Sequence, residues 1–439
     1  MKSYIIKTFG CQMNEHDSEV LAGMLEAVGY RSTEDTSTAD LVLLNTCCIR
    51  ETAENKVFSY LGRLKRQKLS NPAMIIGVCG CMPQQEGMAA RLRQLFPYVD
   101  LVFGTHNVQQ LPVFIGRILA ERKPVVEILT EPAEIIEGLP AVRKEGLRAW
   151  VTIMHGCDNY CTYCIVPYVR GRERSRKPDD IIREMPGLGS EGFKEVVLLG
   201  QNVNSYGKDL TPPLDFAGLL EKLDGVSSIE RIRYMTSHPR DFNEKLILTI
   251  ARLGKVCEHF HLPVQSGSSR ILEKMHRGYT REHYLGLIEK IRLHIPKATI
   301  TTDIMVGFPG EENDDFRATM DLVSQVRFDS SYTFVYNARP GTPAAGMAEQ
   351  VPEEIKKQRI QALIKLQNTI SLENNKAEEG SWQEVLVEGE RNNASGLVYG
   401  KSRGYKTVVF PGDKTLIGST AHVTITRAHL AYLEGSLKN

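Results

Sequence analysis

The sequence predicts an α/β protein of three domains. These are a doubly wound parallel sheet at the N-terminus, a partial, TIM-like (β/α)6 barrel in the centre and a small, OB-like β-barrel at the C-terminus. Three observations lead to this prediction. The chain has 439 residues, more than a single core usually holds. Short apolar stretches alternate with helical ones in two series of different spacing. After the second series, the sequence alternates apolar and polar residues between glycines.

The first series predicts the N-terminal sheet, over residues 1–118. Its strands are expected at 4–7, 41–44, 74–78 and 101–103. Between them, residues 16–28 and 50–68 carry apolar side chains at helical spacing. Strands that alternate with helices form a parallel sheet, so this domain is expected to be doubly wound. Residues 119–145, rich in Pro, Glu and Lys, are interpreted as a linker.

The second series predicts the central barrel, over residues 146–373. Its strands are expected at 149–156, 195–201, 231–237, 258–264, 298–307 and 331–337, and its helices at 178–186, 215–223, 241–253, 281–294 and 312–326. Six β–α units are fewer than the eight of a closed barrel. We therefore expect an open, partial barrel, whose open side can admit a large substrate.

The C-terminal domain, residues 374–439, is predicted to be all β. A connecting helix is expected at 352–379, with Pro352 in its first turn. The segments 384–389, 395–402, 405–410 and 421–428 then alternate apolar and polar residues. This pattern predicts a closed five-stranded barrel.

Composition limits the possible functions. Apolar residues make up 42% and charged residues 24%, as in soluble globular proteins, and no apolar run is long enough for a membrane span. Without a recognisable signal peptide, a cytoplasmic protein is expected. The net charge of +1 leaves nucleic-acid contacts to local patches. The nine cysteines are clustered, which points to metal or redox chemistry more than to disulfides.

One cluster is the motif HGCDNYCTYC, in which Cys157, Cys161 and Cys164 follow the first barrel strand. Barrel enzymes keep their chemistry at this end of the strands. A closed zinc or cuboidal iron–sulfur site has four ligands, so three thiolates leave one position open. The alternative is a zinc knuckle with His155 as the fourth ligand. Structural zinc usually ties together small domains that lack a core, and His155 lies too close to Cys157 for the usual spacing.

Cysteines also follow three strands of the N-terminal sheet: Cys11, the pair Cys47 and Cys48, and Cys79 with Cys81. Loops after parallel strands meet at one edge of a sheet, so these side chains are expected to converge. Cys79 lies within a strand and is interpreted as a buried apolar residue. Cys81 is the better ligand, while the residues alone do not choose between Cys47 and Cys48. A second site of three thiolates is therefore expected.

The first motif resembles that of the radical S-adenosylmethionine (SAM) enzymes, in which three cysteines hold a 4Fe–4S cluster. The resemblance implies that SAM binds the open iron through its amino and carboxylate groups. It also implies that an electron from the cluster cleaves SAM to a 5′-deoxyadenosyl radical. Tyr163 matches the family's aromatic residue that packs near the SAM adenine.

Further SAM contacts are expected at the ends of the later barrel strands, where cofactor sites gather. The candidates are Gln201, Asn202, Ser237, Gln265, Ser266 and Gly307. Each of them alone is explained as well by ordinary loop chemistry. Their shared location is what favours a cofactor site.

Over about residues 3–437 the chain resembles the methylthiotransferase family. The matching motifs are TFGCQMNEHDSE, NTCCIRETAENKV, GVCGCMPQ, HGCDNYCTYC, HLPVQSGS and MHRGYTRE, followed by the β-rich tail. The resemblance selects Cys47 and Cys81, and so implies a second 4Fe–4S cluster on Cys11, Cys47 and Cys81. The Gln12-Met13-Asn14 sequence favours the branch that acts on N6-dimethylallyladenosine in tRNA. The C-terminal module is identified as a TRAM domain, which binds RNA.

Two basic segments are candidates for RNA contacts. Arg170, Arg172, Arg174 and Arg176 stand at every second position, so an extended segment would project all four from one side. RNA phosphates would suit these arginines, whereas the alternative is a solvated basic loop. In the C-terminal module, Lys401, Arg403 and Lys406 surround Tyr405, as in small barrels that bind single strands. The alternative there is a structural barrel with ordinary surface lysines.

The resemblance implies an enzyme that adds a methylthio group to C2 of a prenylated adenosine beside the anticodon. One SAM methylates a sulfur on the second cluster and another yields the radical, which is needed because C2 has no leaving group or acidic proton. The expected partners are a tRNA anticodon stem-loop and an electron donor such as flavodoxin or ferredoxin. A monomer is expected, and the sequence indicates neither the sulfur donor nor catalytic residues beyond the clusters. The alternatives are a related enzyme acting on threonylcarbamoyl-adenosine or a ribosomal protein, and a zinc-bound, non-catalytic RNA-binding protein.

Overall fold

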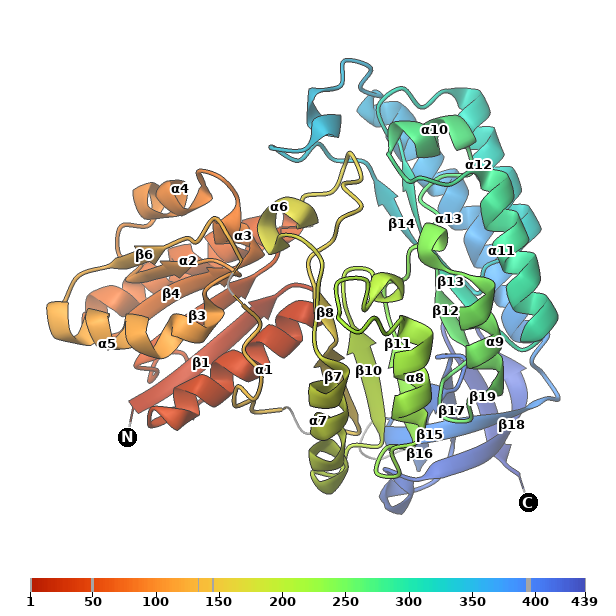
Figure 1. Cartoon of the computed structure of the whole chain (residues 1–439), viewed down its shortest axis with the longest axis horizontal. Helices are drawn as coiled ribbons and strands as arrows, with labels where there is room; N and C mark the ends of the chain where they lie inside the picture. Colours follow the sequence, from red (N-terminus) through yellow and green to blue (C-terminus); the bar gives the residue numbers. More distant parts are fainter. Residues whose placement is uncertain (1, 49–50, 133, 144–145, 392–395, 439) are drawn as a thin grey trace.

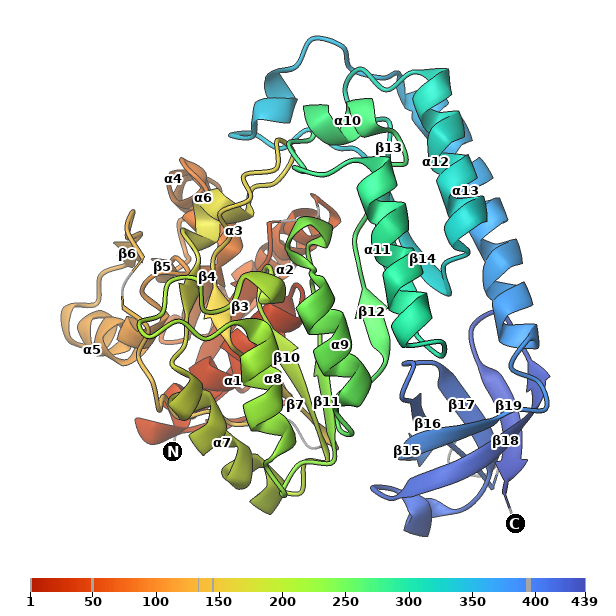
Figure 2. The same cartoon turned by 45° about the vertical axis from the view of Figure 1, so that its right-hand side comes forward.

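The computed structural model describes residues 2–48, 51–132, 134–143, 146–391 and 396–438. Figure 1 shows the N-terminal domain beside the central barrel, and Figure 2 shows the C-terminal barrel packed against one end of the central strands. Among the described residues, no helix combines the length and apolarity needed to cross a bilayer.

The N-terminal domain is a six-stranded sheet in the order β2-β1-β3-β4-β5-β6, with all neighbours parallel. Its strands are β1 (Lys2–Phe9), β2 (Tyr30–Ser32), β3 (Leu41–Thr46), β4 (Ile75–Gly80), β5 (Leu101–Phe103) and β6 (Val125–Glu127), and its helices are α1 (Gln12–Ala27), α2 (Glu51–Ser70), α3 (Cys81–Gln84), α4 (Met88–Leu95) and α5 (Leu111–Glu121). One apolar core joins the sheet to α1 and α5, and a second joins its other face to α2 and α4. The predicted doubly wound sheet is confirmed.

The segment expected to be a linker contributes to this sheet. The helix α5 continues to Glu121, and β6 then pairs with β5 as the sixth strand. Strand β6 has only three residues, and an edge strand of this length shows no periodicity in the sequence. The equally short β2 at the opposite edge was not predicted for the same reason.

The central domain contains the six predicted strands, in two parallel sheets ordered β11-β10-β7 and β12-β13-β14. The strands are β7 (Arg148–Thr152), β10 (Glu195–Leu199), β11 (Arg231–Tyr234), β12 (His259–His261), β13 (Thr299–Val306) and β14 (Ser330–Val335). A parallel bridge between Ile232 and Val256 links the two halves. The outer strands of the two sheets, β7 and β14, do not pair with each other, so the barrel stays open on that side. The predicted partial (β/α)6 barrel is confirmed.

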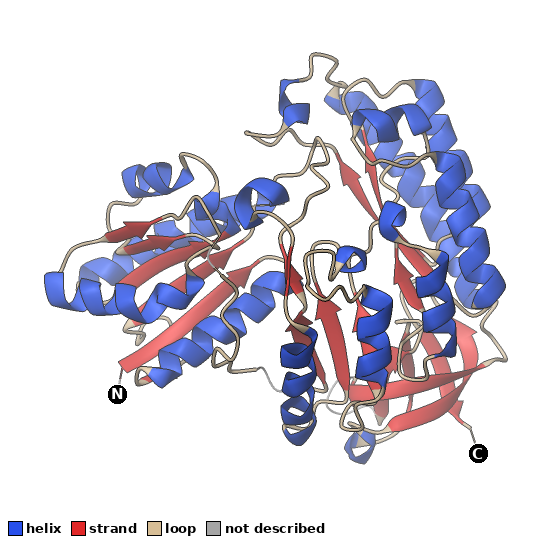
Figure 3. Cartoon of the chain, in the orientation of Figure 1, coloured by secondary structure: helices blue, strands red, loops and turns tan. Residues whose placement is uncertain are grey.

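Helices cover the outside of these strands, as Figure 3 shows. They are α7 (Pro178–Ser190), α8 (Phe216–Asp224), α9 (Glu244–Arg252), α10 (Ser269–Lys274), α11 (Arg281–His294), α12 (Asn313–Val326) and α13 (Glu353–Lys376). Side chains of Asp215, Asn243, Ser268 and Thr280 accept hydrogen bonds from the first turns of α8 to α11. The short elements β8 (Met154–His155), α6 (Val166–Arg170) and β9 (Arg174–Ser175) lie between β7 and α7.

The C-terminal domain is the predicted closed barrel, in the order β15-β16-β17-β19-β18. Its strands are β15 (Trp382–Glu390), β16 (Leu397–Ser402), β17 (Thr407–Pro411), β18 (Thr420–Ala428) and β19 (Leu433–Leu437). Inward-facing residues such as Val385, Val408 and Val423 form its core.

The turn between β16 and β17 attaches this barrel to the amino ends of the central strands. The guanidinium of Arg233 donates hydrogen bonds to the carbonyls of Ser402 and Arg403, both at 2.6 Å, and Arg231 donates to the carbonyl of Lys401 at 2.8 Å. The Tyr405 ring stacks on His259, with ring centroids 5.2 Å apart. The turn therefore covers the end of the central barrel that lies away from the cysteine motif.

The basic side chains of this turn also face the central barrel. Arg403 forms an ion pair with Glu258 at 2.7 Å, and Lys406 forms one with Asp329 at 3.0 Å. Lys401 donates to Thr407 and lies over the Tyr405 ring. The expected open basic face is thus an interdomain contact in the structure, and an RNA-binding role for these residues stays a prediction.

Candidate active site

The first cysteine site lies on the loop between β8 and α6. Backbone hydrogen bonds hold the loop from both sides, because Cys157 N donates to Gly171 O at 3.1 Å and Thr162 N donates to Met275 O at 3.1 Å. Gly156 has φ of 76°, and a Cβ there would overlap the Arg172 carbonyl. Elements far apart in the sequence therefore fix the positions of the three thiols.

Burial determines the protonation of these thiols. It raises the pKa of Cys157 and of Cys164 to about 12. Both groups are therefore neutral thiols in the metal-free chain, and a metal must displace their protons to bind. The guanidinium of Arg277 donates a hydrogen bond to Cys161 Sγ at 3.3 Å.

The second cysteine site lies at the carboxyl edge of the N-terminal sheet. Cys11 precedes α1, Cys47 and Cys48 follow β3, and Cys81 begins α3. A hydrogen bond from the Cys47 thiol lowers the pKa of Cys11 to about 6. Burial acts in the opposite direction, and the positive charge of Arg170 lowers the pKa further. In the same way, the thiol of Cys48 hydrogen-bonds Cys81 and lowers the pKa of Cys81. The predicted convergence of the three loops is present in the structure.

A buried pair of asparagines fixes two of these loops. The Asn14 side chain accepts a hydrogen bond from Cys11 N at 3.3 Å and donates one to Asn45 Oδ1 at 3.2 Å. Asn45 in turn donates to the Asn14 carbonyl at 2.8 Å. A Cβ at Gly10 would overlap the Asn14 side chain. The residues around the cysteines in GCQMN and NTC thus have a structural role.

The helix α6, which follows the first cysteine motif, lies beside α3, which begins at Cys81 (Figure 1). Ile165, directly after Cys164, and Val169 pack against Cys48 and Cys81. Arg170, the last residue of α6, forms an ion pair with Asp17 of α1 at 2.7 Å. The motif that carries one site is therefore in van der Waals contact with the other.

Polar atoms without partners line the loops after β10 and β11. They are Gln201 Oε1, Ser237 Oγ, both polar side-chain atoms of Asn204, and His238 Nε2, which are buried with no hydrogen-bond partner among the described residues. Buried polar groups in this state are costly, so a bound molecule with several donors and acceptors is expected to complete them. Gln201 and Ser237 were predicted. Asn204 and His238 were missed because their sequence context is that of an ordinary loop.

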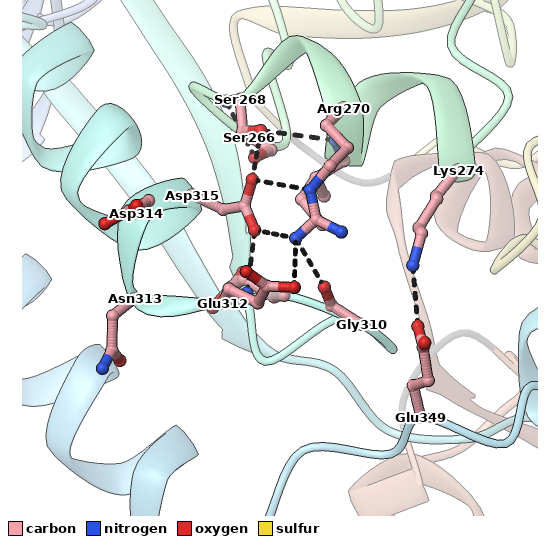
Figure 4. Close-up of polar contacts among 12 residues, drawn as sticks. Ser266, Ser268, Arg270, Lys274, Gly310, Glu312, Asn313, Asp314, Asp315 and Glu349 are labelled. Carbon is pink, nitrogen blue, oxygen red and sulfur yellow. Dashed lines mark hydrogen bonds and ion pairs between the residues drawn. The ribbon is translucent and has the colours of Figure 1, made fainter.

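Other predicted contacts serve different partners in the structure. Asn202 links two loops, donating to Asp241 at 2.8 Å and accepting from His238 N at 3.2 Å. Ser266 accepts from Ser268 N at 3.2 Å, within the polar network around Asp315 shown in Figure 4. A role for Asn202 and Ser266 in SAM binding stays a prediction.

The remaining predicted contacts also lie at the carboxyl ends of the barrel strands. The Tyr163 ring packs edge-on against Phe308, with centroids 6.5 Å apart. Gly307 has φ of 75° and lies against the side chain of Lys356. Gln265 has φ of 68°, and Thr236 in the loop after β11 has φ of 69°. Such backbone conformations in non-glycine residues cluster at functional sites.

The four arginines after the first cysteine motif do not form one row. Arg170 ends a helix, and Gly171 with φ of 76° turns the chain before β9. Arg176 is mostly buried and pairs with Glu137 at 2.6 Å. Arg174 lines a cavity of about 450 Å³ between the first two domains, together with Arg170 and Arg176, whereas Arg172 is 73% exposed. The segment is therefore not extended throughout, and Arg172 points away from the cavity that the other three arginines line.

In the part of the chain that the structure describes, no three His, Cys, Asp or Glu side chains converge closely enough to hold a single metal ion. His155 belongs to β8 and lines the interdomain cavity. A cuboidal cluster bonds each thiolate to a different iron, so its ligands stand further apart than those of one ion.

Known families match all three domains. The family described as Uncharacterized protein family UPF0004 matches residues 3–104, the Radical SAM superfamily matches 151–323 and the TRAM domain matches 376–438. The fold and the site thus define a radical SAM enzyme with an added N-terminal cysteine site and a C-terminal TRAM domain.

Curated relatives match over the whole length. A protein of Pelotomaculum thermopropionicum named tRNA-2-methylthio-N(6)-dimethylallyladenosine synthase is 65% identical over 438 residues, covering 100% of this chain and 98% of the relative. Relatives of the same name from Desulforamulus reducens and Carboxydothermus hydrogenoformans are 57% and 56% identical over 436 residues, covering 99% of this chain and 95% and 99% of their own. The chain belongs to the tRNA-2-methylthio-N(6)-dimethylallyladenosine synthase family.

Solved structures share the fold. The radical SAM methyltransferase TsrM from Kitasatospora setae, with cobalamin and a [4Fe-4S] cluster bound, has a TM-score of 0.58 at 15% identity, covering 79% of this chain and 74% of that one. The cobalamin-dependent SAM radical enzyme OxsB has a TM-score of 0.54 at 11% identity, covering 84% and 58%.

Proposed function

We propose that this protein adds a methylthio group to C2 of N6-dimethylallyladenosine beside the anticodon of tRNA. It uses SAM and two 4Fe–4S clusters. The observation that carries the proposal is the 65% sequence identity, over 438 residues, to a synthase of this name. The two cysteine sites on either side of α6 support it. The first cysteine site has three thiols, as an open iron requires, and the second has four, of which three are assigned as ligands.

We assign one cluster to Cys157, Cys161 and Cys164 and the other to Cys11, Cys47 and Cys81. When bound, the clusters and SAM supply the methyl group, the radical and the sulfur that the reaction needs. The chain holds the thiolates in fixed loops, and Cys47, Cys81, Cys157 and Cys161 are buried. The partnerless polar atoms of Gln201, Asn204 and Ser237 orient SAM.

The RNA substrate is expected to reach the site through the open side of the barrel. The TRAM domain match supports RNA binding. Arg172, exposed beside the first cysteine loop, is suited to a phosphate of the anticodon loop, and its exposed ion pair with Asp158 is easily exchanged. The target base must leave its stack, which costs less in a loop than in a duplex.

We further propose that the enzyme works in the cytoplasm as a monomer. A low-potential one-electron donor, such as flavodoxin or ferredoxin, is expected to reduce the clusters. The lack of a membrane-spanning helix among the described residues is compatible with this setting.

Neighbouring cysteines provide a test of the second cluster's ligands. The Cys48 thiol hydrogen-bonds Cys81 and lies buried beside Ile165 and Val169, and both the hydrogen bond and burial raise the pKa of Cys48 well above its ordinary value. We therefore expect Cys47→Ala to lose about half of the iron and Cys48→Ala to keep nearly all of it. Iron and sulfide analysis of the two variants measures this. Equal iron in both variants would exclude Cys47 as the unique ligand.

Nucleoside analysis tests the substrate. A strain that lacks this protein should accumulate N6-dimethylallyladenosine without the methylthio group, and re-expression should restore the modified nucleoside. Mass spectrometry of digested tRNA measures both forms. If threonylcarbamoyl-adenosine or a ribosomal protein lost its methylthio group instead, the sister reaction would be the correct one.

A further inference from the structure

One buried cation beside the first cysteine site lacks a carboxylate partner. Arg277 follows α10 in the motif MHRGYTRE and is 5% exposed. Its guanidinium donates to Cys161 Sγ at 3.3 Å, to Pro263 O at 2.8 Å and to the hydroxyls of Tyr279 and Tyr163 at 3.3 and 3.5 Å. Among the described residues, no carboxylate lies within ion-pair distance of it.

Other buried arginines of the protein do have such partners. Arg233 pairs with Glu195 at 2.8 Å, Arg359 pairs with Glu311 at 2.6 Å and Arg170 pairs with Asp17 at 2.7 Å. An isolated charge inside a protein is very unfavourable, and an arginine cannot release its proton to avoid the cost. Arg277 therefore requires an anion that is not a side-chain carboxylate.

The cysteine site supplies that anion once it is loaded. Three thiolates outweigh the positive charge of an oxidised 4Fe–4S core, so the site is anionic, and one added electron increases its negative charge. Hydrogen bonds to cluster sulfur and nearby positive charge both favour the reduced form. Arg277 provides both the hydrogen bond and the positive charge through its contact with Cys161 Sγ.

We infer that Arg277 is the counter-ion of the cluster on Cys157, Cys161 and Cys164 and raises its reduction potential. Arg277 is a positioning residue, because it acts through the thiolate of Cys161. The inference rests on the proposed function, in that this site must hold a 4Fe–4S cluster. Arg277 makes the one-electron reduction of the cluster by a low-potential donor easier. The later chemistry is left to other groups.

The test compares Arg277→Gln, which removes the charge, with Arg277→Lys, which keeps it. Each variant is purified anaerobically as the full chain with both clusters and titrated with a chemical reductant. Electron paramagnetic resonance follows the reduced cluster whose signal changes when SAM is added. The potential is a readout that a purely structural role would not move.

A matched control is Arg270→Gln, on α10. The Arg270 guanidinium is partly exposed, pairs with Asp315 and donates to the Gly310 carbonyl at 2.8 Å (Figure 4). It has a carboxylate partner and does not contact the cysteines, so its removal should leave the cluster potential unchanged.

We expect the ratio of reduced to oxidised cluster in Arg277→Gln, at a fixed potential near the midpoint of the unaltered protein, to fall at least tenfold, a shift of about 59 mV to more negative potential for one electron. Arg277→Lys should recover most of this loss. If the glutamine variant loses this cluster and the lysine variant keeps it, the counter-ion role is supported. An unchanged potential in Arg277→Gln, or equal behaviour of the two variants, overturns the inference. Absence of clusters from the unaltered protein would instead overturn the proposed function.

Discussion

Replacing Cys157 by alanine should remove about half of the iron and abolish the formation of 5′-deoxyadenosine from SAM. Only three thiols are available at this site, and Cys157 is fixed by its backbone hydrogen bond to Gly171. His155 cannot replace it, because it belongs to β8 and lines the interdomain cavity. The measurements are iron analysis of the anaerobically purified protein and chromatography of the SAM products.

A second cysteine provides the control for this experiment. Cys257 is buried, like Cys157 and Cys161, but lies at the opposite end of the barrel, near Arg233. Cys257→Ala should keep all of the iron and form 5′-deoxyadenosine normally, with a small loss of stability from the cavity. Full iron in Cys157→Ala, or iron loss in both variants, would contradict the assignment.

Replacing Glu195 by alanine should strongly destabilise the contact between the central and C-terminal barrels. Glu195 is fully buried and pairs with Arg148 at 2.5 Å and with Arg233 at 2.8 Å. Arg233 also holds the turn that contains Ser402 and Arg403. Removal of one partner from a buried ion pair costs about 3–5 kcal/mol, because the remaining charge is left without compensation. For a domain of this size the melting temperature should fall by about 10 °C.

The pH dependence of this contact follows from the pKa of Glu195. Burial alone would raise that pKa, but Arg233 and Arg148 outweigh burial and lower it. A carboxyl whose pKa is lower in the folded state stabilises the fold above its unfolded pKa. That contribution is lost as the pH falls through the folded value. The Glu195 ion pairs are therefore expected to be intact at neutral pH and lost only in acid.

Glu230→Ala is the matched control, since Glu230 pairs with Lys194 at 2.8 Å on the surface next to the same strands. Exposed ion pairs contribute about 0–1 kcal/mol, so its melting temperature should change little. Thermal unfolding followed by circular dichroism compares the variants. Equal melting temperatures for Glu195→Ala and Glu230→Ala would show that the buried ion pairs do not hold the domains together.

Local patterns in the sequence were enough to predict most of the fold. The six strands of the central barrel lie within or beside their predicted ranges, because continuous apolar stretches bounded by polar loops are typical of buried parallel strands. The cysteines of the N-terminal domain could be grouped because loops after parallel strands share an edge. The strands that were not placed are the short β2, β6 and β9 and the five-residue β19 (Leu433–Leu437).

The directions of side chains in loops could not be predicted in this way. A single glycine, Gly171 with φ of 76°, turns the chain between Arg170 and Arg172, and Gly156 packs closely against the carbonyls of this turn. The turn around Tyr405 has the composition of an RNA-binding face, but its side chains meet carboxylates that lie far away in the sequence, such as Glu258. Arg277 was part of a recognised motif, and only the folded structure shows that it lacks a carboxylate partner.

The proposed function requires two 4Fe–4S clusters in the chain, each on three cysteines. Iron and acid-labile sulfide analysis of the anaerobically purified protein tests it most directly. With both clusters bound, the protein should be brown and contain about eight irons and eight sulfides per chain. A colourless protein that holds stoichiometric zinc would contradict it and favour the non-catalytic RNA-binding alternative.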